Sequence, residues 1–240
     1  MSNVAVIDSG MGGAAIYKQL KRVMPRHDYL YFCDNLHFPY GEKSGDELID
    51  VAFDIFKKIT DLYDLSCAVL ACNTLTAFAV DALRRAYPSL LIVGTEPAVK
   101  QALQYTAGNV AVACTSACAS SERIRKRFSS PNVEFVPFPL LALMIEEGAS
   151  QKELFDYVEN IAAGLDRSFD SVVLGCTHFL LIKDVFSRVF IRQKLFDGAT
   201  GVANRVKSLI GKKTANSTTC IVLSKEDNDK RQRLLTLLRQ

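Results

Sequence analysis

Two cysteines stand at matching places in two distant parts of the chain. Cys72 follows an apolar run at 68–71 and precedes a helical pattern at 77–83, and Cys176 follows the run at 172–175. A cysteine between a strand and a helix meets unpaired backbone N–H groups and the positive end of the helix dipole, which favour a thiolate or a bound carboxylate. One such cysteine is usually a core residue. Two of them with polar neighbours indicate chemistry.

Two opposed thiols suit the inversion of a stereocentre that carries a weakly acidic C–H. One group must remove the proton from one face while the other returns a proton to the opposite face. A thiol, with an ordinary pKa of about 8.5, can take either part near neutral pH. Three side chains are placed to tune the thiols: Asp8 near Cys72, Glu146 near Cys176, and His178 beside Cys176.

Other polar side chains near these junctions, together with unpaired amides, have the chemistry to hold an amino acid's carboxylate and ammonium groups. They are Ser9, Asn73, Thr74, Thr115 and Thr177.

The composition is that of a globular protein, with 240 residues, 49% hydrophobic and 23% charged. No apolar run is long enough to span a bilayer, and Asp8 interrupts the start where a signal peptide needs an apolar stretch, so we expect a cytoplasmic protein. The net charge of +3 is spread along the chain, so neither nucleic acid nor a membrane is expected as a partner. Seven cysteines without a C-x-x-C spacing predict neither a disulfide framework nor a metal site.

Short β-branched or apolar runs alternate with helical patterns along the whole chain, which predicts parallel βαβ units. Strands are expected at 4–7, 29–32, 68–71, 90–93, 110–112, 133–136 and 172–174, and helices at sites such as 46–63 and 153–165.

The second half repeats the landmarks of the first. Val110 follows Val4 by 106 residues, and Cys176 and Gly198 follow Cys72 and Gly94 by 104 each. We therefore predict an α/β fold of two similar lobes, each a mostly parallel sheet flanked by helices, with the active site in the cleft between them. The first lobe would comprise 1–96 plus 199–240, and the second 97–198. Ligands of such sheets bind beyond the carboxyl ends of the strands, where the polar residues above are expected.

Five motifs resemble, in order, those of the glutamate racemase family. They are Asp-Ser-Gly-x-Gly-Gly at 8–13, Pro-Tyr-Gly at 39–41, Ala-Cys-Asn-Thr at 71–74, Glu-Glu-Gly at 146–148 and Gly-Cys-Thr-His-Phe at 175–179. The resemblance covers the chain from Val4 to about Val206. It implies a cofactor-independent two-base racemase that makes D-glutamate for peptidoglycan synthesis, and hence for cell-wall biogenesis and cell shape.

The resemblance also implies roles for single residues. Cys72 and Cys176 would be the bases, assisted by Asp8, Glu146 and His178, with no metal. Substrate contacts would come from Asp8, Ser9, Tyr40, Gly41, Asn73, Thr74, Thr177 and His178. The partner would be the small-molecule substrate, L- or D-glutamate, and a homodimer is one assembly to test because the family is often dimeric. Cys118 departs from the family, which often has a substrate-binding Thr there.

Three other functions stay open at this point. Aspartate or another small amino acid would suit the paired cysteines equally well. A Cys/His hydrolase would need one nucleophile and an oxyanion hole, and would leave the second cysteine unexplained. A non-catalytic binding protein on the racemase fold is suggested only by Cys118 and the short polar C-terminal part.

Several residues have simpler interpretations. Asp8 is a candidate helix N-cap, and Asp34 is a candidate to hold the loop at 39–41. His27 and His37 are expected on the surface. Four cysteines are expected as small apolar core residues: Cys33, Cys67, Cys114 and Cys220. Lys212–Lys213 and the charged run at 225–233 are expected to form a solvated end and helix face.

Overall fold

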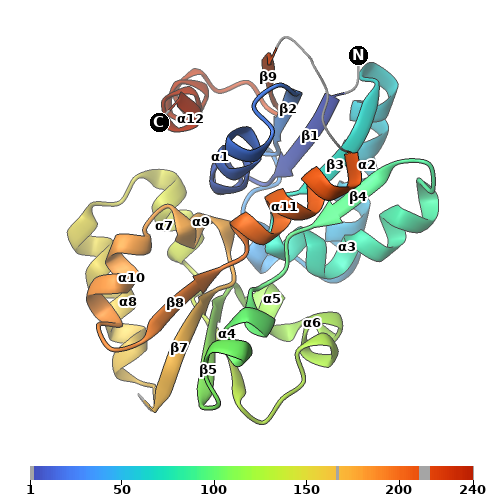
Figure 1. Ribbon diagram of the computed structural model, residues 1–240. Helices are drawn as coiled ribbons and strands as arrows, with labels where there is room; N and C mark the ends of the chain where they lie inside the picture. Colours follow the sequence, from blue (N-terminus) through green and yellow to red (C-terminus); the bar gives the residue numbers. More distant parts are fainter. Residues whose placement is uncertain (1–2, 166–167, 211–216, 240) are drawn as a thin grey trace.

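The fold consists of two separate parallel sheets in the computed structural model, which describes residues 3–165, 168–210 and 217–239 (Figure 1). The first sheet has the strand order β4-β3-β1-β2-β9 and the second β6-β5-β7-β8. The strands of the first sheet are β1 (Asn3–Asp8), β2 (Asp28–Cys33), β3 (Leu65–Leu70), β4 (Leu91–Gly94) and β9 (Thr219–Leu223). Those of the second are β5 (Asn109–Cys114), β6 (Val133–Pro137), β7 (Phe169–Leu174) and β8 (Lys194–Asp197).

The two sheets share one topology. When β5, β6, β7 and β8 are matched to β1, β2, β3 and β4, the strand order is the same, and β9 is an addition at the edge beside β2. Even the irregularities agree, because pairing of the central strand shifts register between Asn3 and Val4 in one sheet and between Asn109 and Val110 in the other. The repeat and the two-lobed α/β fold predicted from the sequence are confirmed. The lobe limits 1–96 plus 199–240 and 97–198 stay a proposal.

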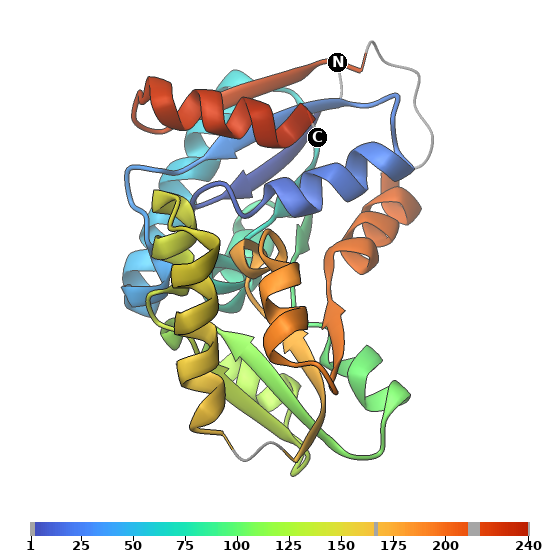
Figure 2. The same cartoon turned by 90° about the vertical axis from the view of Figure 1, so that its left-hand side faces the viewer.

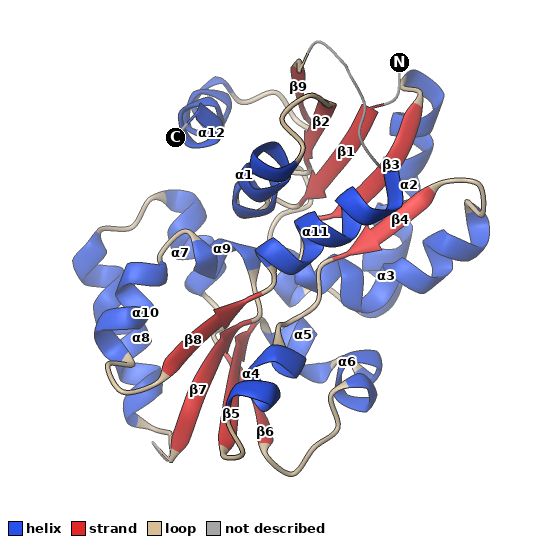
Figure 3. Cartoon of the chain, viewed as in Figure 1, coloured by secondary structure: helices blue, strands red, loops and turns tan. Residues whose placement is uncertain are grey.

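Side chains that alternate along β1 divide the first core into two layers. Val4 and Val6 face α1 (Ala14–Val23), α11 (Ala199–Ile210) and α12 (Asn228–Arg239). Ala5 and Ile7 face α2 (Gly45–Leu62) and α3 (Asn73–Ala86) on the opposite side. Capping by Ser44, whose side chain accepts from the Glu47 amide, begins α2. Figure 3 shows helices on both faces of this sheet.

The second sheet is covered in the same way. Ala111 and Ala113 face the layer of α7 (Leu141–Glu147), α8 (Gln151–Ala163), α9 (Thr177–Leu180) and α10 (Lys183–Val189). Val110 and Val112 face α4 (Val99–Tyr105), α5 (Ser116–Ser120) and α6 (Glu122–Arg127). Both central strands are thus buried on both faces, as in other sheets with helices on each side.

The C-terminal segment completes the first lobe. β9 pairs with β2, and α12 packs on α1, as Figure 2 shows at the top of the molecule. Leu234 on α12 is fully buried. The run at 225–233 does form part of a helix, but the prediction that it is merely solvated was wrong, because one face of α12 is covered. Lys212 and Lys213 lie outside the described residues.

Two other residues differ from expectation. His27 is buried, with 3% of its surface exposed, and Cys220 is exposed on β9 at the edge of the sheet. Both lie near strand ends or edges, where apolar content does not determine which side chain is covered. No helix within the described ranges is both long and apolar enough to cross a bilayer.

Candidate active site

The two predicted cysteines occupy equivalent positions, one in each lobe. Cys72 follows β3 and is the N-cap of α3, where its Sγ accepts a hydrogen bond from the Leu75 amide at 3.5 Å. Cys176 follows β7, the strand equivalent to β3, and is the N-cap of α9. Each cysteine is 6% exposed. The two thiols are near enough that the charge of Cys176 raises the pKa of Cys72.

Asp8 at the end of β1 lies beside Cys72 and contacts the other lobe. Its Oδ2 accepts from Thr177 Oγ1 at 3.3 Å, and its Oδ1 accepts from Ser9 Oγ at 3.2 Å and from the Gly10 amide at 3.3 Å. Burial, with the nearby charge of Glu146, raises the pKa of Asp8 to about 6, although the His178 charge and these hydrogen bonds to Gly10 and Ser9 oppose the rise. Burial and the charge of Asp8 raise the pKa of Cys72 well above its usual value.

A buried ion pair supports the other cysteine. Glu146, in the last turn of α7, accepts through Oε2 from the Met11 amide at 3.0 Å and pairs with His178 Nε2 at 2.8 Å. Burial opposes protonation of His178, but hydrogen bonds with Cys176 and Glu146 raise its pKa well above the usual value. Burial also opposes ionisation of Glu146, but His178 outweighs it and lowers the pKa of this carboxyl. The pair is therefore an imidazolium and a carboxylate next to Cys176.

Two glycines explain why the loop after β1 can reach this pair. A Cβ on Gly10 would lie 2.5 Å from Glu146 Oε2, and a Cβ on Gly12 would lie 2.5 Å from His178 Nδ1 and 2.7 Å from the His178 backbone nitrogen. Residues with side chains cannot approach so closely. The glycines of the Asp-Ser-Gly-x-Gly-Gly motif thus make room for the opposite lobe, rather than for a nucleotide.

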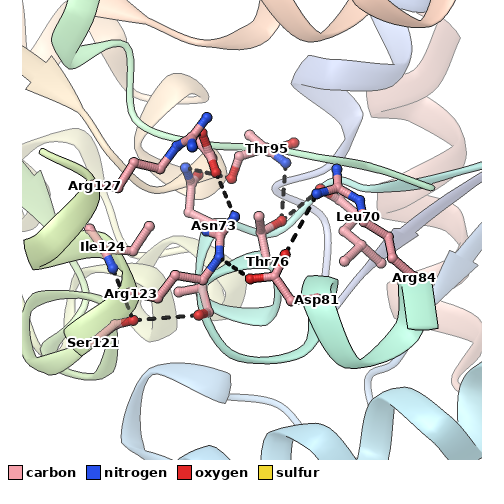
Figure 4. A network of polar contacts seen from close by, with 12 residues as sticks. Leu70, Asn73, Thr76, Asp81, Arg84, Thr95, Ser121, Arg123, Ile124 and Arg127 are labelled. Carbon is pink, nitrogen blue, oxygen red and sulfur yellow. Dashed lines mark hydrogen bonds and ion pairs between the residues drawn. The ribbon is translucent and has the colours of Figure 1, made fainter. Parts of the chain in front are cut away.

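The predicted substrate-binding residues gather around the same centre. Thr74 on α3 and Thr115, the N-cap of α5, share a hydrogen bond of 2.8 Å between their hydroxyls, and this bond also joins the two lobes. Asn73 Nδ2 donates to the Thr95 carbonyl at 3.2 Å, which ties the start of α3 to the segment after β4 (Figure 4). A Cβ on Gly41 would lie 3.1 Å from Thr115 Cβ, so the loop after β2 reaches the second lobe as well.

Tyr40 belongs to this loop, in the short helix η1 (Tyr40–Glu42). Its hydroxyl donates to Asp34 Oδ2 at 2.6 Å, and His37 Nδ1 contacts the same oxygen at 2.9 Å. Asp34 therefore holds the loop. His37 is only partly exposed, its side chain 33% accessible, because of this contact. Asp8 is not a helix cap, because α1 begins after Gly13.

Cys118 does not present its thiol in place of a threonine hydroxyl. Its side chain is fully buried in a core cluster with Cys114, and its amide donates to Thr115 Oγ1 at 3.2 Å. The hydroxyls nearest this point of the site are thus those of Thr115 and Thr74.

Sequence reasoning missed two basic residues of α12. Lys230 Nζ lies 3.0 Å from Glu146 Oε1, and Arg233 Nη1 donates to the Glu146 carbonyl at 2.7 Å. They stand in a run of charges, which ordinarily indicates a solvated surface. The apolar spacing of Leu234, Leu237 and Leu238 was the signal that one side of this helix is covered.

Comparison with known proteins decides the family. The family model described as Asp/Glu/Hydantoin racemase matches residues 4–206. The chain belongs to the Asp/Glu/hydantoin racemase family. A glutamate racemase of Glaesserella parasuis is 36% identical over 218 residues, covering 86% of this chain and 80% of the relative. A glutamate racemase of Clostridium perfringens is 32% identical over 213 residues, with 85% and 81% covered.

Solved racemase structures agree with this fold. The Escherichia coli glutamate racemase in complex with L-glutamate and the activator UDP-MurNAc-Ala has a TM-score of 0.85 at 26% identity, covering 99% of this chain and 94% of that one. Glutamate racemase RacE1 of Bacillus anthracis has a TM-score of 0.87 at 22% identity, covering 100% and 94%, which supports the fold alone. This racemase therefore has the family's architecture over its whole length, including β9 and α12.

Proposed function

We propose that this amino-acid racemase interconverts L- and D-glutamate by a two-base mechanism without a cofactor. One observation carries the proposal: two thiols cap equivalent helices of two lobes, and each has its own polar support. A single-nucleophile hydrolase would not need the second thiol. The choice of glutamate is supported by relatives of that name at 36% and 32% identity.

The steps follow from the positions of the two thiols. The thiolate of Cys176 removes the Cα proton from L-glutamate, and the thiol of Cys72 delivers a proton to the opposite face, which gives D-glutamate. Cys176 ends as the thiol and Cys72 as the thiolate, so one proton is taken and one is given. The reverse reaction exchanges their parts. The raised pKa of Cys72 suits it to be the proton donor in the free protein.

The supporting residues have distinct tasks in this mechanism. The imidazolium of His178, held by Glu146, stabilises a thiolate at Cys176 by its charge. Asp8 lies beside Cys72, where its carboxylate attracts the substrate ammonium group. Amides at the start of α3 and the hydroxyls of Thr74 and Thr115 bind the α-carboxylate, on which negative charge grows as the Cα proton leaves. Ser9, Tyr40, Gly41, Asn73, Thr177 and His178 complete the predicted substrate contacts.

The cellular role follows from the product. D-Glutamate made by this reaction would supply peptidoglycan synthesis, and so cell-wall biogenesis and cell shape. We propose a cytoplasmic location, the small-molecule substrate as the partner, and a homodimer as the assembly to test. Nucleic acid and membrane are not part of the proposal.

The proposal is tested by incubating the protein with L-glutamate in D₂O and following optical activity and the Cα proton signal together. We expect loss of optical rotation with one deuterium incorporated at Cα per inversion. L-Aspartate and L-alanine, tested in parallel, should react at least about a hundredfold more slowly in kcat/KM, a difference of roughly 2.7 kcal/mol in transition-state binding. Faster turnover of aspartate would move the substrate within the family, and silence with every amino acid would contradict the racemase proposal.

A further inference from the structure

Lys230 turns inward from the C-terminal helix. It lies on α12, which belongs to the first lobe through β9, yet its side chain is only 17% exposed. Its Nζ lies 3.0 Å from Glu146 Oε1 and 5.5 Å from the centre of the Phe38 ring. An inward-facing lysine loses hydration and side-chain freedom, so it requires a partner that compensates.

The partner is the unsupported half of the Glu146 carboxylate. Oε2 is held by the Met11 amide and by His178, whereas Oε1 has no hydrogen bond within the described residues and faces the Lys230 ammonium group. Without Lys230 this oxygen would be buried with no cation against it. Arg233, one turn further along α12, holds the backbone carbonyl of the same glutamate. The C-terminal helix therefore fixes both ends of one residue on α7.

The same contacts lead on to His178. The Phe38 ring lies beneath Lys230, and its centre is 5.5 Å from the centre of the His178 ring. Glu146 binds His178 Nε2, which leaves Nδ1 for the Cys176 thiol. Lys230 is thus two contacts away from Cys176, by way of Glu146 and His178.

We propose that Lys230 is a positioning residue: from the C-terminal helix it fixes the Glu146 carboxylate and thereby sets the orientation and charge of His178 beside Cys176. The effect on turnover rests on the proposed function, in which Cys176 is one of the bases. The effect on His178 itself does not.

The sign of the electrostatic effect depends on every charged group around the imidazole. Glu146 on α7, Asp8 at the end of β1 and the Cys176 thiol favour the imidazolium. The loop before α1 contributes only glycine at this point. From α12, Lys230 offsets part of the Glu146 charge and lowers the pKa of that carboxyl. Its removal leaves the carboxylate to act on His178 alone, so the imidazolium should be held more tightly and titrate at a higher pH.

The test compares Lys230→Met with Lys225→Met, which removes an exposed lysine just before the same helix, and with Lys230→Arg, which keeps the charge. In Lys230→Met we expect kcat/KM for glutamate to fall about tenfold in both directions, since the equilibrium constant of a racemisation is one. The alkaline limb of the pH–rate profile should move upward, and so should the His178 titration followed by ¹⁵N NMR. The chain has three histidines, so one His37→Gln variant assists assignment. Lys225→Met should match the wild type, and Lys230→Arg should recover activity to within about threefold.

The outcomes separate the two proposals. If the wild type racemises glutamate but Lys230→Met leaves the His178 titration and the pH profile unchanged, Lys230 is not a positioning residue and the proposed function stands. If the titration moves while no amino acid is racemised, the link from Lys230 to His178 stands and the proposed function fails. Should Lys230→Met not fold, Lys230→Gln, which keeps a donor without the charge, must still shift the titration, and an unshifted titration there overturns the proposal.

Discussion

Asp8 shows how the site trades stability for chemistry at the scale of one residue. The carboxyl is fully buried, and its pKa is raised from 3.8 to about 6. A group with a raised folded-state pKa contributes stability below its unfolded pKa and loses that contribution as the pH rises through its folded pKa. Near neutral pH, an ionised Asp8 therefore destabilises the fold, while it provides the negative charge that the proposed mechanism places beside Cys72.

Replacing Asp8→Asn should stabilise the protein and impair it. The asparagine can keep hydrogen bonds with Ser9, Gly10 and Thr177 without the buried charge. We expect the free energy of unfolding at pH 8 to rise by about 1–3 kcal/mol, with the gain disappearing below pH 4, and kcat to fall by about a hundredfold or more. Urea unfolding at both pH values measures the first effect. A variant less stable than the wild type at pH 8 would contradict this account of Asp8.

The cysteines offer a second test at the same scale. Cys220 is exposed, whereas Cys72 and Cys176 are each 6% exposed. In a Cys220→Ser background, which should retain full activity, we expect iodoacetamide to inactivate the enzyme slowly, faster with rising pH because the thiolate reacts, and more slowly with glutamate present. Mass spectrometry should place the label on Cys72 or Cys176. Full labelling of either without loss of activity would contradict its assignment.

Single residues were predicted unevenly, for a physical reason. Cys72, Cys176 and His178 follow strongly apolar strands, so their place at a strand end is fixed by the pattern. His27, Cys220 and Lys230 lie at strand starts, sheet edges or in a charged helix, where burial depends on which distant element packs against them. Lys230 is buried by Glu146, 84 positions earlier in the chain, and no local pattern conveys that contact.

At the scale of elements, the site is a set of helix starts and loops at the carboxyl ends of parallel strands. β1, β3, β5 and β7 deliver Asp8, Cys72, Thr115 and Cys176, and each strand was predictable as a β-branched or apolar run between turn residues. β9 and α12 were not predicted. β9 is short and only partly buried, and α12 has many charged residues, so neither has a strong periodicity.

The loop between β1 and α1 gives a prediction for an element. Gly12→Ala would place a methyl group against the first turn of α9, so we expect a loss of about 1–3 kcal/mol in unfolding free energy and at least about a tenfold loss in kcat. Gly201→Ala is the matched control, because a Cβ at Gly201 in α11 meets nothing within 4 Å. That variant should gain about 0.5–1 kcal/mol with unchanged activity. Equal effects of the two substitutions would show that the approach to His178 has no importance.

At the scale of the whole molecule, the two lobes are joined by several contacts of different kinds. Thr177 with Asp8 and Thr74 with Thr115 cross at the site. On another side, Arg123 of α6 donates from Nε to Asp81 of α3 at 2.8 Å and from Nη2 to Glu96 at 2.9 Å, as Figure 4 shows for the first pair. α12 adds Lys230 and Arg233. The repeat in the sequence predicted two lobes, but it could not predict these contacts, because each joins residues that are distant in the chain.

The Arg123 contacts should show their electrostatic nature in salt. Its side chain is 23% exposed, so screening is partial. We expect Arg123→Met to lower the free energy of unfolding by about 1 kcal/mol at low salt, and the difference from the wild type to shrink in 1 M NaCl. Lys152→Met, which removes an exposed pair with Asp156 on α8, should change stability by no more than about 0.5 kcal/mol. A difference that salt leaves unchanged would indicate a packing role for Arg123 instead.

The most direct test of the central claim, one thiol for each face of Cα, is the partial chemistry of the two serine variants. Serine is a far weaker acid than cysteine, so Cys72→Ser and Cys176→Ser should each abolish full racemisation. A glutamate with a leaving group on Cβ reports proton removal by elimination, without an acid on the other face. Cys72→Ser should eliminate only from the L-substrate, through Cys176, and Cys176→Ser only from the D-substrate, through Cys72. The opposite pairing would exchange the two roles, whereas racemisation at the wild-type rate by either variant would contradict the two-base mechanism.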